Sequence, residues 1–484
     1  MRTKVKADYV IGYENEKHIL LKNSEIVYEG DTILYVGPSF PKTVDATIDM
    51  GNAILSPGFI DLNALGDIDH DSIHTEQPKH MQANLLWSKE YYDNGPKEFF
   101  SAEEEAFKSL YAYAQLVLNG TTTAMPITSV FYKRWAETLE ELEAAAQHAE
   151  KLGLRIYLGP SYQGGMRIVS EDGEITVAFN EKEGQAGLER AVQFIQKYDG
   201  ASGGLIRGML APERIETQTP TLLQQTKAYS KELGVPIRLH AAQGKFEYDY
   251  ITKTYGKTPI GYLYDLDFLD QNTAIPHCTF TSESVGDTNI YGSDLELLKE
   301  TQPTIIHCPL IIGRHGTALK SFAAYKEKEI PLAIGTDTFP PDMFMNIRTA
   351  SMLSRIVNEG KMENSRFRDI FYAATIGGAD FLGRPDLGRL SPGAKADFIA
   401  IDLSGFHIGP IDDPFITMCM AATGRDVVLS IINGKIVMKD RQLPGINLDD
   451  LKKRAQSYFQ KLKESYLERD YQHLGQTKLF AKGL

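Results

Sequence analysis

The 484-residue chain is 42% hydrophobic and 24% charged, which is typical of a globular protein with a large core. Its formal net charge of −13, without a Lys/Arg-rich run, argues against sequence-nonspecific binding of nucleic acid, because attraction to phosphates requires a basic face. No apolar run approaches the roughly 18 residues that span a bilayer, and no apolar signal core follows the N-terminus, so we expect a cytoplasmic protein without a membrane partner.

Both ends of the chain show the pattern of a small antiparallel sheet. Residues 1–52 alternate short apolar segments with turns, and similar β-rich segments return after residue 390. There, Asn433-Gly434 separates two β-rich runs, which is a strong hairpin signal. We therefore expect residues 1–52 and 390–447 to form one discontinuous β-sandwich domain, followed by a helical extension over residues 448–484.

The middle of the chain alternates short apolar strands with helical segments. One predicted helix begins at Ser101, where Ser101-Ala102-Glu103-Glu104 resembles a capping box, and it continues through Leu118. Eight predicted strands occupy segments starting near residues 55, 121, 154, 205, 236, 273, 303 and 331. Eight β/α units in series predict an α/β fold, a (β/α)₈ TIM barrel over residues 53–389.

Polar residues follow several of these strands. His240, His277, His307 and Asp337 lie at the ends of the last four strands, and Asn63 lies at the end of the first. A barrel of this kind places its active site where the strands end. One histidine in an apolar strand is usually a satisfied core residue. Three on successive strands, with an aspartate on the next, are difficult to bury without a shared ligand.

Such a cluster suits metal chemistry. Imidazole nitrogen and carboxylate oxygen are ligands for a borderline divalent ion, most often Zn²⁺, with Co²⁺ or Mn²⁺ as alternatives. A metal lowers the pKa of its bound water towards ~7. A nearby carboxylate can take the proton, and a histidine can return it to the leaving group. We therefore predict a divalent metal ion at this cluster.

The cysteines suggest neither a disulfide framework nor a zinc knuckle. There are three, an odd number, without a CxxC spacing. Cys278 and Cys308 each follow a histidine inside an apolar run, where a small buried hydrophobic residue is the more common role than a nucleophile.

Over nearly its whole length, the sequence resembles the amidohydrolase superfamily, in particular the branch of cytosolic deaminases and chlorohydrolases. The segments that carry this resemblance are PGFID, GTTTAM, LHAAQ, PHCTF, IIHCPL, AIGTDT, AATIGGADFLG and LGRLSPGAKADFIAIDL. It implies that His240 is a metal ligand and that Asp337 is both a ligand and the general base. His277 would be a ligand or the group that orients the water and handles protons. The resemblance also implies a homodimer.

Three positions depart from the superfamily pattern. Asn63 and Leu65 stand where the family has two metal-binding histidines, and Gln243 stands where the deaminases have a glutamate that moves protons. An asparagine at the first position is similar to the molinate and phenylurea hydrolases, although these retain the second histidine. This similarity favours hydrolysis of an amide, urea or carbamate-type C–N bond over deamination of a ring.

The simplest predicted site is one metal ion held by His240, His277 and Asp337, with Asn63 as a fourth ligand or bridging through water. Residues of the loop after the first strand are alternatives for the missing ligands: Asp67, Asp69, His70 and His74. For contact with a small-molecule substrate we predict Gln243, His307, Arg314 and His70. Two of these have equally ordinary alternatives, an ion pair for Arg314 and a hydrogen bond within the core for His307.

Three functions are thus open. The first is a metal-dependent amidohydrolase that cleaves a C–N bond of a small molecule. The second is an aminohydrolase acting on a purine, pyrimidine or triazine ring. The third is a non-catalytic relative that has lost its metal, which the missing histidines and Gln243 would favour.

Overall fold

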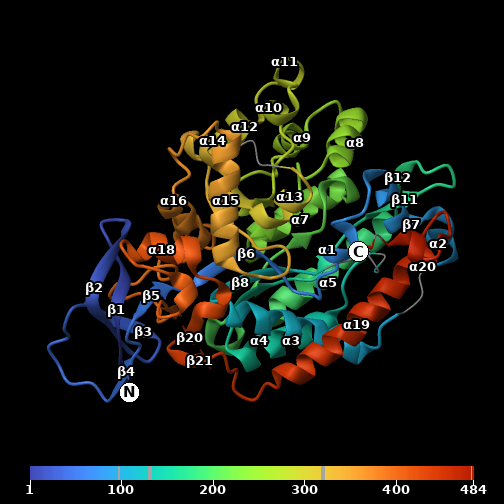
Figure 1. The fold of residues 1–484 in the computed structure, drawn as a ribbon. Helices are drawn as coiled ribbons and strands as arrows, with labels where there is room; N and C mark the ends of the chain where they lie inside the picture. Colours follow the sequence, from blue (N-terminus) through green and yellow to red (C-terminus); the bar gives the residue numbers. More distant parts are fainter. Residues whose placement is uncertain (96–98, 129–132, 134, 318–321, 481, 484) are drawn as a thin grey trace.

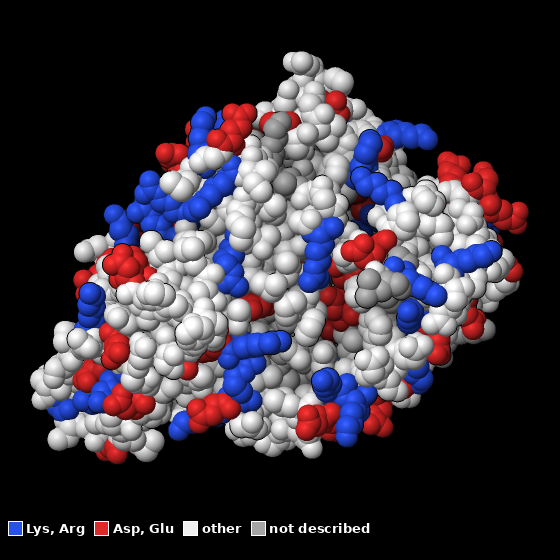
Figure 2. Space-filling model, in the orientation of Figure 1, with Lys and Arg blue, Asp and Glu red and all other residues white. Residues whose placement is uncertain are grey.

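The computed structural model of the chain describes residues 1–95, 99–128, 133, 135–317, 322–480 and 482–483. A sheet built from both chain ends lies on one side of the molecule, and the helices of a barrel lie on the other (Figure 1). Lys and Arg side chains lie beside Asp and Glu over much of the face in Figure 2, as is typical of a solvated surface. None of the described helices has the combination of length and apolarity needed to cross a bilayer.

The strands of the two chain ends pair in one eight-stranded sheet, ordered β21-β20-β19-β5-β1-β2-β3, with β4 beside β1. Their bounds are β1 Arg2–Glu14, β2 Lys17–Glu29, β3 Thr32–Gly37, β4 Ala46–Asp49, β5 Ala53–Pro57, β19 Phe398–Asp402, β20 Val427–Ile432 and β21 Lys435–Lys439. The turn Asn433-Gly434, with φ of 52° and 71°, joins β20 to β21. Positive φ at both positions is what a type I′ hairpin turn requires. The predicted hairpin is confirmed.

Eight further strands form the barrel as two four-stranded sheets, β13-β9-β8-β6 and β15-β16-β17-β18. Their bounds are β6 Phe59–Leu65, β8 Thr121–Ile127, β9 Arg155–Leu158, β13 Ile206–Gly208, β15 Ile237–Arg238, β16 Thr273–Pro276, β17 Thr304–His307 and β18 Leu332–Ile334. A parallel bridge between Leu210 and Ile237 joins the two sheets on one side. On the other side the N–H of Asp337 donates to the carbonyl of Asn63 at 2.9 Å. The predicted α/β barrel is confirmed, although residues 53–57, which were expected at its start, form β5 of the chain-end sheet.

Helices cover the outside of the barrel, and their bounds agree with the sequence pattern where caps were recognisable. The Ser101 hydroxyl accepts from the N–H of Glu104, whose carboxylate accepts from the N–H of Ser101, so the predicted capping box is confirmed. The longer helices are α3 Ala102–Leu118, α4 Leu139–Leu152, α5 Glu181–Tyr198, α7 Pro220–Leu233, α8 Lys245–Tyr255, α9 Pro259–Asp265, α12 Asp294–Thr301, α15 Met343–Val357, α18 Pro414–Ala421 and α19 Leu448–Arg469.

Short elements fill the connections. The short helices are α1 Asp71–His74, α2 Lys89–Asn94, α6 Ala201–Gly204, α10 Ser282–Val285, α11 Thr288–Tyr291, α13 Pro309–Arg314, α14 Phe322–Glu327, α16 Phe367–Tyr372, α17 Gly378–Phe381 and α20 Gln476–Leu479. The short strands are β7 Trp87–Ser88, β10 Ser161–Tyr162, β11 Gly165–Val169, β12 Ile175–Phe179 and β14 Ala211–Pro212. All three cysteines are buried and free, as expected of small core residues.

The C-terminal helix α19 packs along the barrel and holds the long connection that follows β6 (Figure 1). His74 of this connection lies 2.9 Å from the Tyr466 hydroxyl, and the Asn84 amide donates to Asp470 at 2.7 Å. The rings of Phe100 and Tyr458 stack with centroids 4.2 Å apart. The predicted helical extension therefore holds this connection in place at the mouth of the barrel.

A buried ion pair joins the barrel to the sheet of the chain ends. Arg155 of β9 is 2% exposed, and its Nε and Nη2 donate to the two carboxylate oxygens of Asp397 at 2.8 and 3.2 Å. Asp397 also accepts from the backbone N–H of Asn433 at 2.6 Å. One carboxylate thus holds a barrel strand and the β20–β21 turn together.

We expect Arg155→Met to lower the free energy of unfolding by about 3–5 kcal/mol, because it leaves the buried Asp397 carboxylate without its cation. Urea denaturation followed by circular dichroism measures this loss. The matched control is Lys245→Met, which breaks an exposed i,i+4 pair with Asp249 and should leave the stability unchanged within error. Equal losses in the two variants would contradict the role given to Arg155.

Candidate metal centre and active-site cavity

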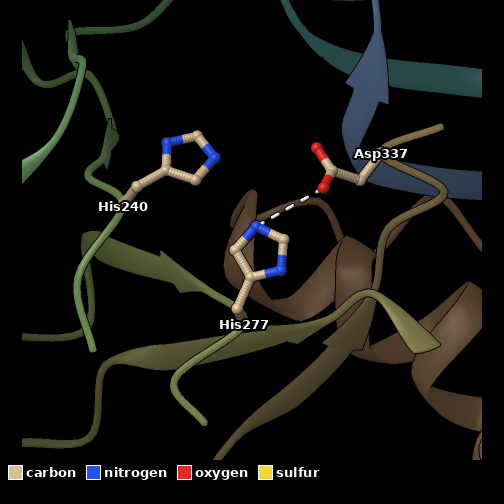
Figure 3. A group of neighbouring side chains, drawn as sticks. All are labelled: His240, His277 and Asp337. Carbon is tan, nitrogen blue, oxygen red and sulfur yellow. Dashed lines mark ion pairs between the residues drawn. The ribbon is translucent and has the colours of Figure 1, made fainter. Parts of the chain in front are cut away.

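His240, His277 and Asp337 come together at the carboxyl ends of the barrel strands. Each offers a ligand atom, and the three atoms lie within 4.8 Å of one another. Figure 3 shows the three side chains converging from separate segments. The His277 Nε2 atom lies 3.4 Å from Asp337 Oδ2, and the rings of His240 and His277 have centroids 5.5 Å apart.

The backbone turns sharply at two of these positions. His277 and Asp337 have φ of 66° and 56°, in the left-handed region that non-glycine residues rarely adopt. Backbone hydrogen bonds hold them there: the N–H of His277 donates to Ile306 at 2.9 Å, and that of Asp337 donates to Asn63 at 2.9 Å. Such strain is found where the surrounding structure fixes a functional side chain.

Both histidines are held in the neutral form. Burial lowers the pKa of His277 to about 3 and that of His240 well below its ordinary value, and the Arg214 guanidinium lowers both further. The contact between His277 and Asp337 is therefore not a pair of opposite charges. His240 Nδ1 lies 3.0 Å from the Glu213 carbonyl oxygen, which can only accept, so this network assigns the proton to Nδ1 and a lone pair to Nε2.

Several buried polar atoms of this cluster have no hydrogen-bond partner within the described part of the chain. They are both ring nitrogens of His277 and the Oδ1 atom of Asn63. The Asn63 Nδ2 atom donates to Asp337 Oδ1 at 2.9 Å. Burial raises the pKa of Asp337 well above its ordinary value. A cation beside these atoms would satisfy the orphan lone pairs and favour the ionised carboxylate, so the donor set fits a divalent metal ion.

None of the four alternative loop residues joins this cluster among the described residues. Asp69 accepts from the Thr338 hydroxyl at 2.6 Å, and Asp67 lies 3.8 Å from the Lys108 ammonium. The rings of His70 and His74 pack against each other near α19, with centroids 5.5 Å apart. The loop therefore supplies no replacement for the strand-1 histidines, and Leu65 presents an apolar side chain to the cavity.

A cavity of about 410 Å³ adjoins His240 and Asp337, which is the size of a small-molecule site. Of the residues predicted to contact substrate, Gln243 and His70 line it. His307 is buried outside its lining and packs against Phe322 with ring centroids 6.0 Å apart. Arg314 is held by Asp71 at 3.2 Å and by Thr338 at 2.7 Å, so the structure shows the ion pair given as its alternative.

The sequence analysis missed these charged residues of the described cavity lining: Asp71, Arg167, Glu213, Arg214 and Arg238. Glu213 and Arg214 directly follow β14, so the general rule that barrel active sites form at strand ends would have found them. Arg238 lies two residues before His240, and alternation along a strand turns it to the same side. Burial raises the pKa of the Glu213 carboxyl group.

Comparisons with known proteins agree with this architecture. The 5-methylthioadenosine/S-adenosylhomocysteine deaminase of Caldanaerobacter subterraneus subsp. tengcongensis is 25% identical over 94% of this chain and 98% of its own. The 5'-deoxyadenosine deaminase of Methanosarcina acetivorans is 24% identical over 86% of this chain and 88% of its own.

Two solved structures share the fold. An adenosine deaminase from Xanthomonas campestris with bound zinc has a TM-score of 0.76 and 20% identity, covering 96% of this chain and 98% of its own. The atrazine chlorohydrolase from Arthrobacter aurescens TC1 complexed with zinc has a TM-score of 0.75 and 18% identity, covering 94% and 100%. The sequence model of the amidohydrolase family matches residues 54–437, which confirms the resemblance seen in the motifs. The chain therefore belongs to the amidohydrolase family and is a hydrolase that acts on carbon–nitrogen bonds.

Proposed function

We propose that this chain hydrolyses an amide, urea or carbamate-type C–N bond of a small molecule, using one divalent metal ion held by His240, His277 and Asp337. The observation that carries the proposal is the convergence of these three groups, with ligand atoms within 4.8 Å, beside a cavity of about 410 Å³. Zn²⁺ is the preferred ion, because two neutral imidazoles and a carboxylate match its ligand preferences.

When bound, a divalent ion would lower the pKa of a water molecule and polarise the bond under attack. Asp337 is the group that would take the proton from that water. The Asn63 amide donates to its Oδ1 atom at 2.9 Å and leaves Oδ2 facing His277 at 3.4 Å. Asn63 thus positions the base. The Oδ1 atom of Asn63, which has no hydrogen-bond partner among the described residues, would serve as a fourth metal ligand.

Deamination of an amino-substituted heterocycle is the second candidate. It is favoured by the deaminase names of the relatives and by Glu213, a carboxyl group with a raised pKa that lines the cavity. Gln243 argues against it, because a neutral amide cannot exchange a proton with a ring nitrogen. A screen of ureas, carbamates, anilides and amino-heterocycles separates the two by their products: deamination replaces the amino group on a ring carbon with oxygen and releases ammonia, whereas the proposed reaction splits the bond between a carbonyl carbon and nitrogen.

The cytoplasmic location and the homodimer expected from the sequence remain predictions. A sedimentation measurement on the purified chain tests the second of them.

We expect Asp337→Asn to reduce kcat/KM by about 10²–10⁴ or more, because an amide cannot accept the proton of the attacking water. The substitution keeps the side-chain shape in a site where the carboxyl group is buried, so thermal unfolding should change little. Steady-state kinetics and a melting curve measure the two effects. The matched control, Asp249→Asn on the exposed face of α8, should leave both unchanged. Near-normal turnover in Asp337→Asn would exclude this residue as the base.

We expect elemental analysis to find about one equivalent of metal per chain, and chelation to abolish activity until Zn²⁺, Co²⁺ or Mn²⁺ is restored. His240→Ala or His277→Ala should remove most of the bound metal. Asn63→Ala, which removes the hydrogen-bond partner of Asp337, should weaken metal binding by about 10- to 100-fold. Full activity in metal-free protein would contradict the proposed chemistry. Failure to bind any of the three ions would instead favour a non-catalytic relative.

A further inference from the structure

Three arginine side chains line the cavity beside the proposed metal centre: Arg167, Arg214 and Arg238. Two of them are paired with carboxylates, Arg167 with Glu216 and Arg214 with Glu213. Arg238 donates through Nη1 to the backbone carbonyls of Met125 and Pro126, both at 2.9 Å, and among the described residues it makes no hydrogen bond to a carboxylate. Carboxylate side chains line the same cavity, namely Asp69, Asp71, Glu213 and Asp337, so an anion site here depends on arginine donors that none of these groups engages.

Arg214 is fixed next to the metal centre by its backbone. It pairs with His240 in a parallel bridge, and the N–H of the following Ile215 donates to the His240 carbonyl at 2.9 Å. Its Nε atom donates to Glu213 Oε1 at 2.9 Å. Among the described residues, no group accepts a hydrogen bond from its Nη2 atom. Nη2 is also not one of the fully buried donors without a partner. This is expected if it faces the open space of the cavity that Arg214 lines.

Gln243 is oriented by Arg214. The Arg214 Nη1 atom donates to Gln243 Oε1. A guanidinium group can only donate, so the amide oxygen of Gln243 must face it and the Nε2 hydrogens must point elsewhere. The Gln243 backbone is held at the same time, because its N–H donates to Glu247 Oε2 at 2.9 Å. Gln243 lines the cavity, and with its amide oxygen turned to Arg214 its Nε2 donors are the groups left for a ligand.

We propose that Arg214 and Gln243 together bind a carboxylate carried by the substrate, next to the C–N bond that is hydrolysed. This deepens the proposed function and rests on it for the identity of the cavity. Two adjacent donors, Arg214 Nη2 and Gln243 Nε2, match the two oxygen atoms of a planar carboxylate. A glutamate at position 243 would repel such a group, so the neutral glutamine is suited to an acidic substrate.

The experiment measures binding of benzoate, its neutral analogue benzamide, and phenyl phosphate to the full chain by isothermal titration calorimetry, both metal-stripped and Zn²⁺-loaded. We expect the metal-stripped protein to bind benzoate about 10- to 100-fold more tightly than benzamide, the range for a hydrogen bond to a charged group. Arg214→Met should abolish this preference, and Gln243→Leu should reduce it. The matched control is Arg207→Met, which removes an exposed arginine that pairs with Asp199 outside the cavity lining.

Equal binding of benzoate and benzamide would overturn the inference, as would binding of phenyl phosphate without benzoate. Benzoate binding that needs Zn²⁺ and survives in Arg214→Met would also overturn it, because the carboxylate would then ligate the metal. If Arg214→Met fails to fold in a melting curve, Gln243→Leu decides the test. The proposed function is tested by different measurements, namely metal content and product release. Failure of the carboxylate site can therefore be distinguished from failure of the proposed function.

Discussion

Two hydrogen bonds between the first and last barrel strands support both the fold and the site. The N–H of Asp337 donates to the Asn63 carbonyl, and the Asn63 amide donates back to the Asp337 carboxylate, both at 2.9 Å. Deeper in the barrel, Asp61 accepts from the N–H of Thr336 at 3.0 Å and from its hydroxyl group. The seam that closes the barrel is therefore made of the same groups that position the proposed base. A substitution at Asn63 removes the side-chain hydrogen bond to the proposed base but leaves the backbone hydrogen bond of the seam in place.

This arrangement gives a physical role to the asparagine that interrupts the family pattern. A histidine at position 63 would offer a lone pair to a metal ion, whereas asparagine offers a donor to the neighbouring carboxylate. With Leu65 beside it, the first strand contributes positioning and an apolar surface. Apart from Asn63 Oδ1, the proposed metal ligands His240, His277 and Asp337 all come from the other half of the barrel.

The sequence predicted the barrel, the chain-end sheet and the grouping of His240, His277 and Asp337, because each depends on a local signal. Strand periodicity, the capping box at Ser101 and the Asn433-Gly434 turn are all readable over a few residues. The bonding of Arg214 to Gln243 was not predictable in this way, since it depends on how two loops meet. The burial of His307 was not predictable either. Both faces of its strand are buried, so the sequence pattern does not show which face meets the cavity.

Contacts made by the C-terminal helix α19 connect it to the lining of the cavity. His74 lines the cavity and lies 2.9 Å from Tyr466 of α19, and the Asn84 amide is held by Asp470 just beyond the helix. A ligand that displaced His74 would break its contact with Tyr466, and any such coupling between the cavity and the helix would be reciprocal. Binding in the cavity would thus be linked to a helix residue, Tyr466, that lies 392 positions after His74 in the chain.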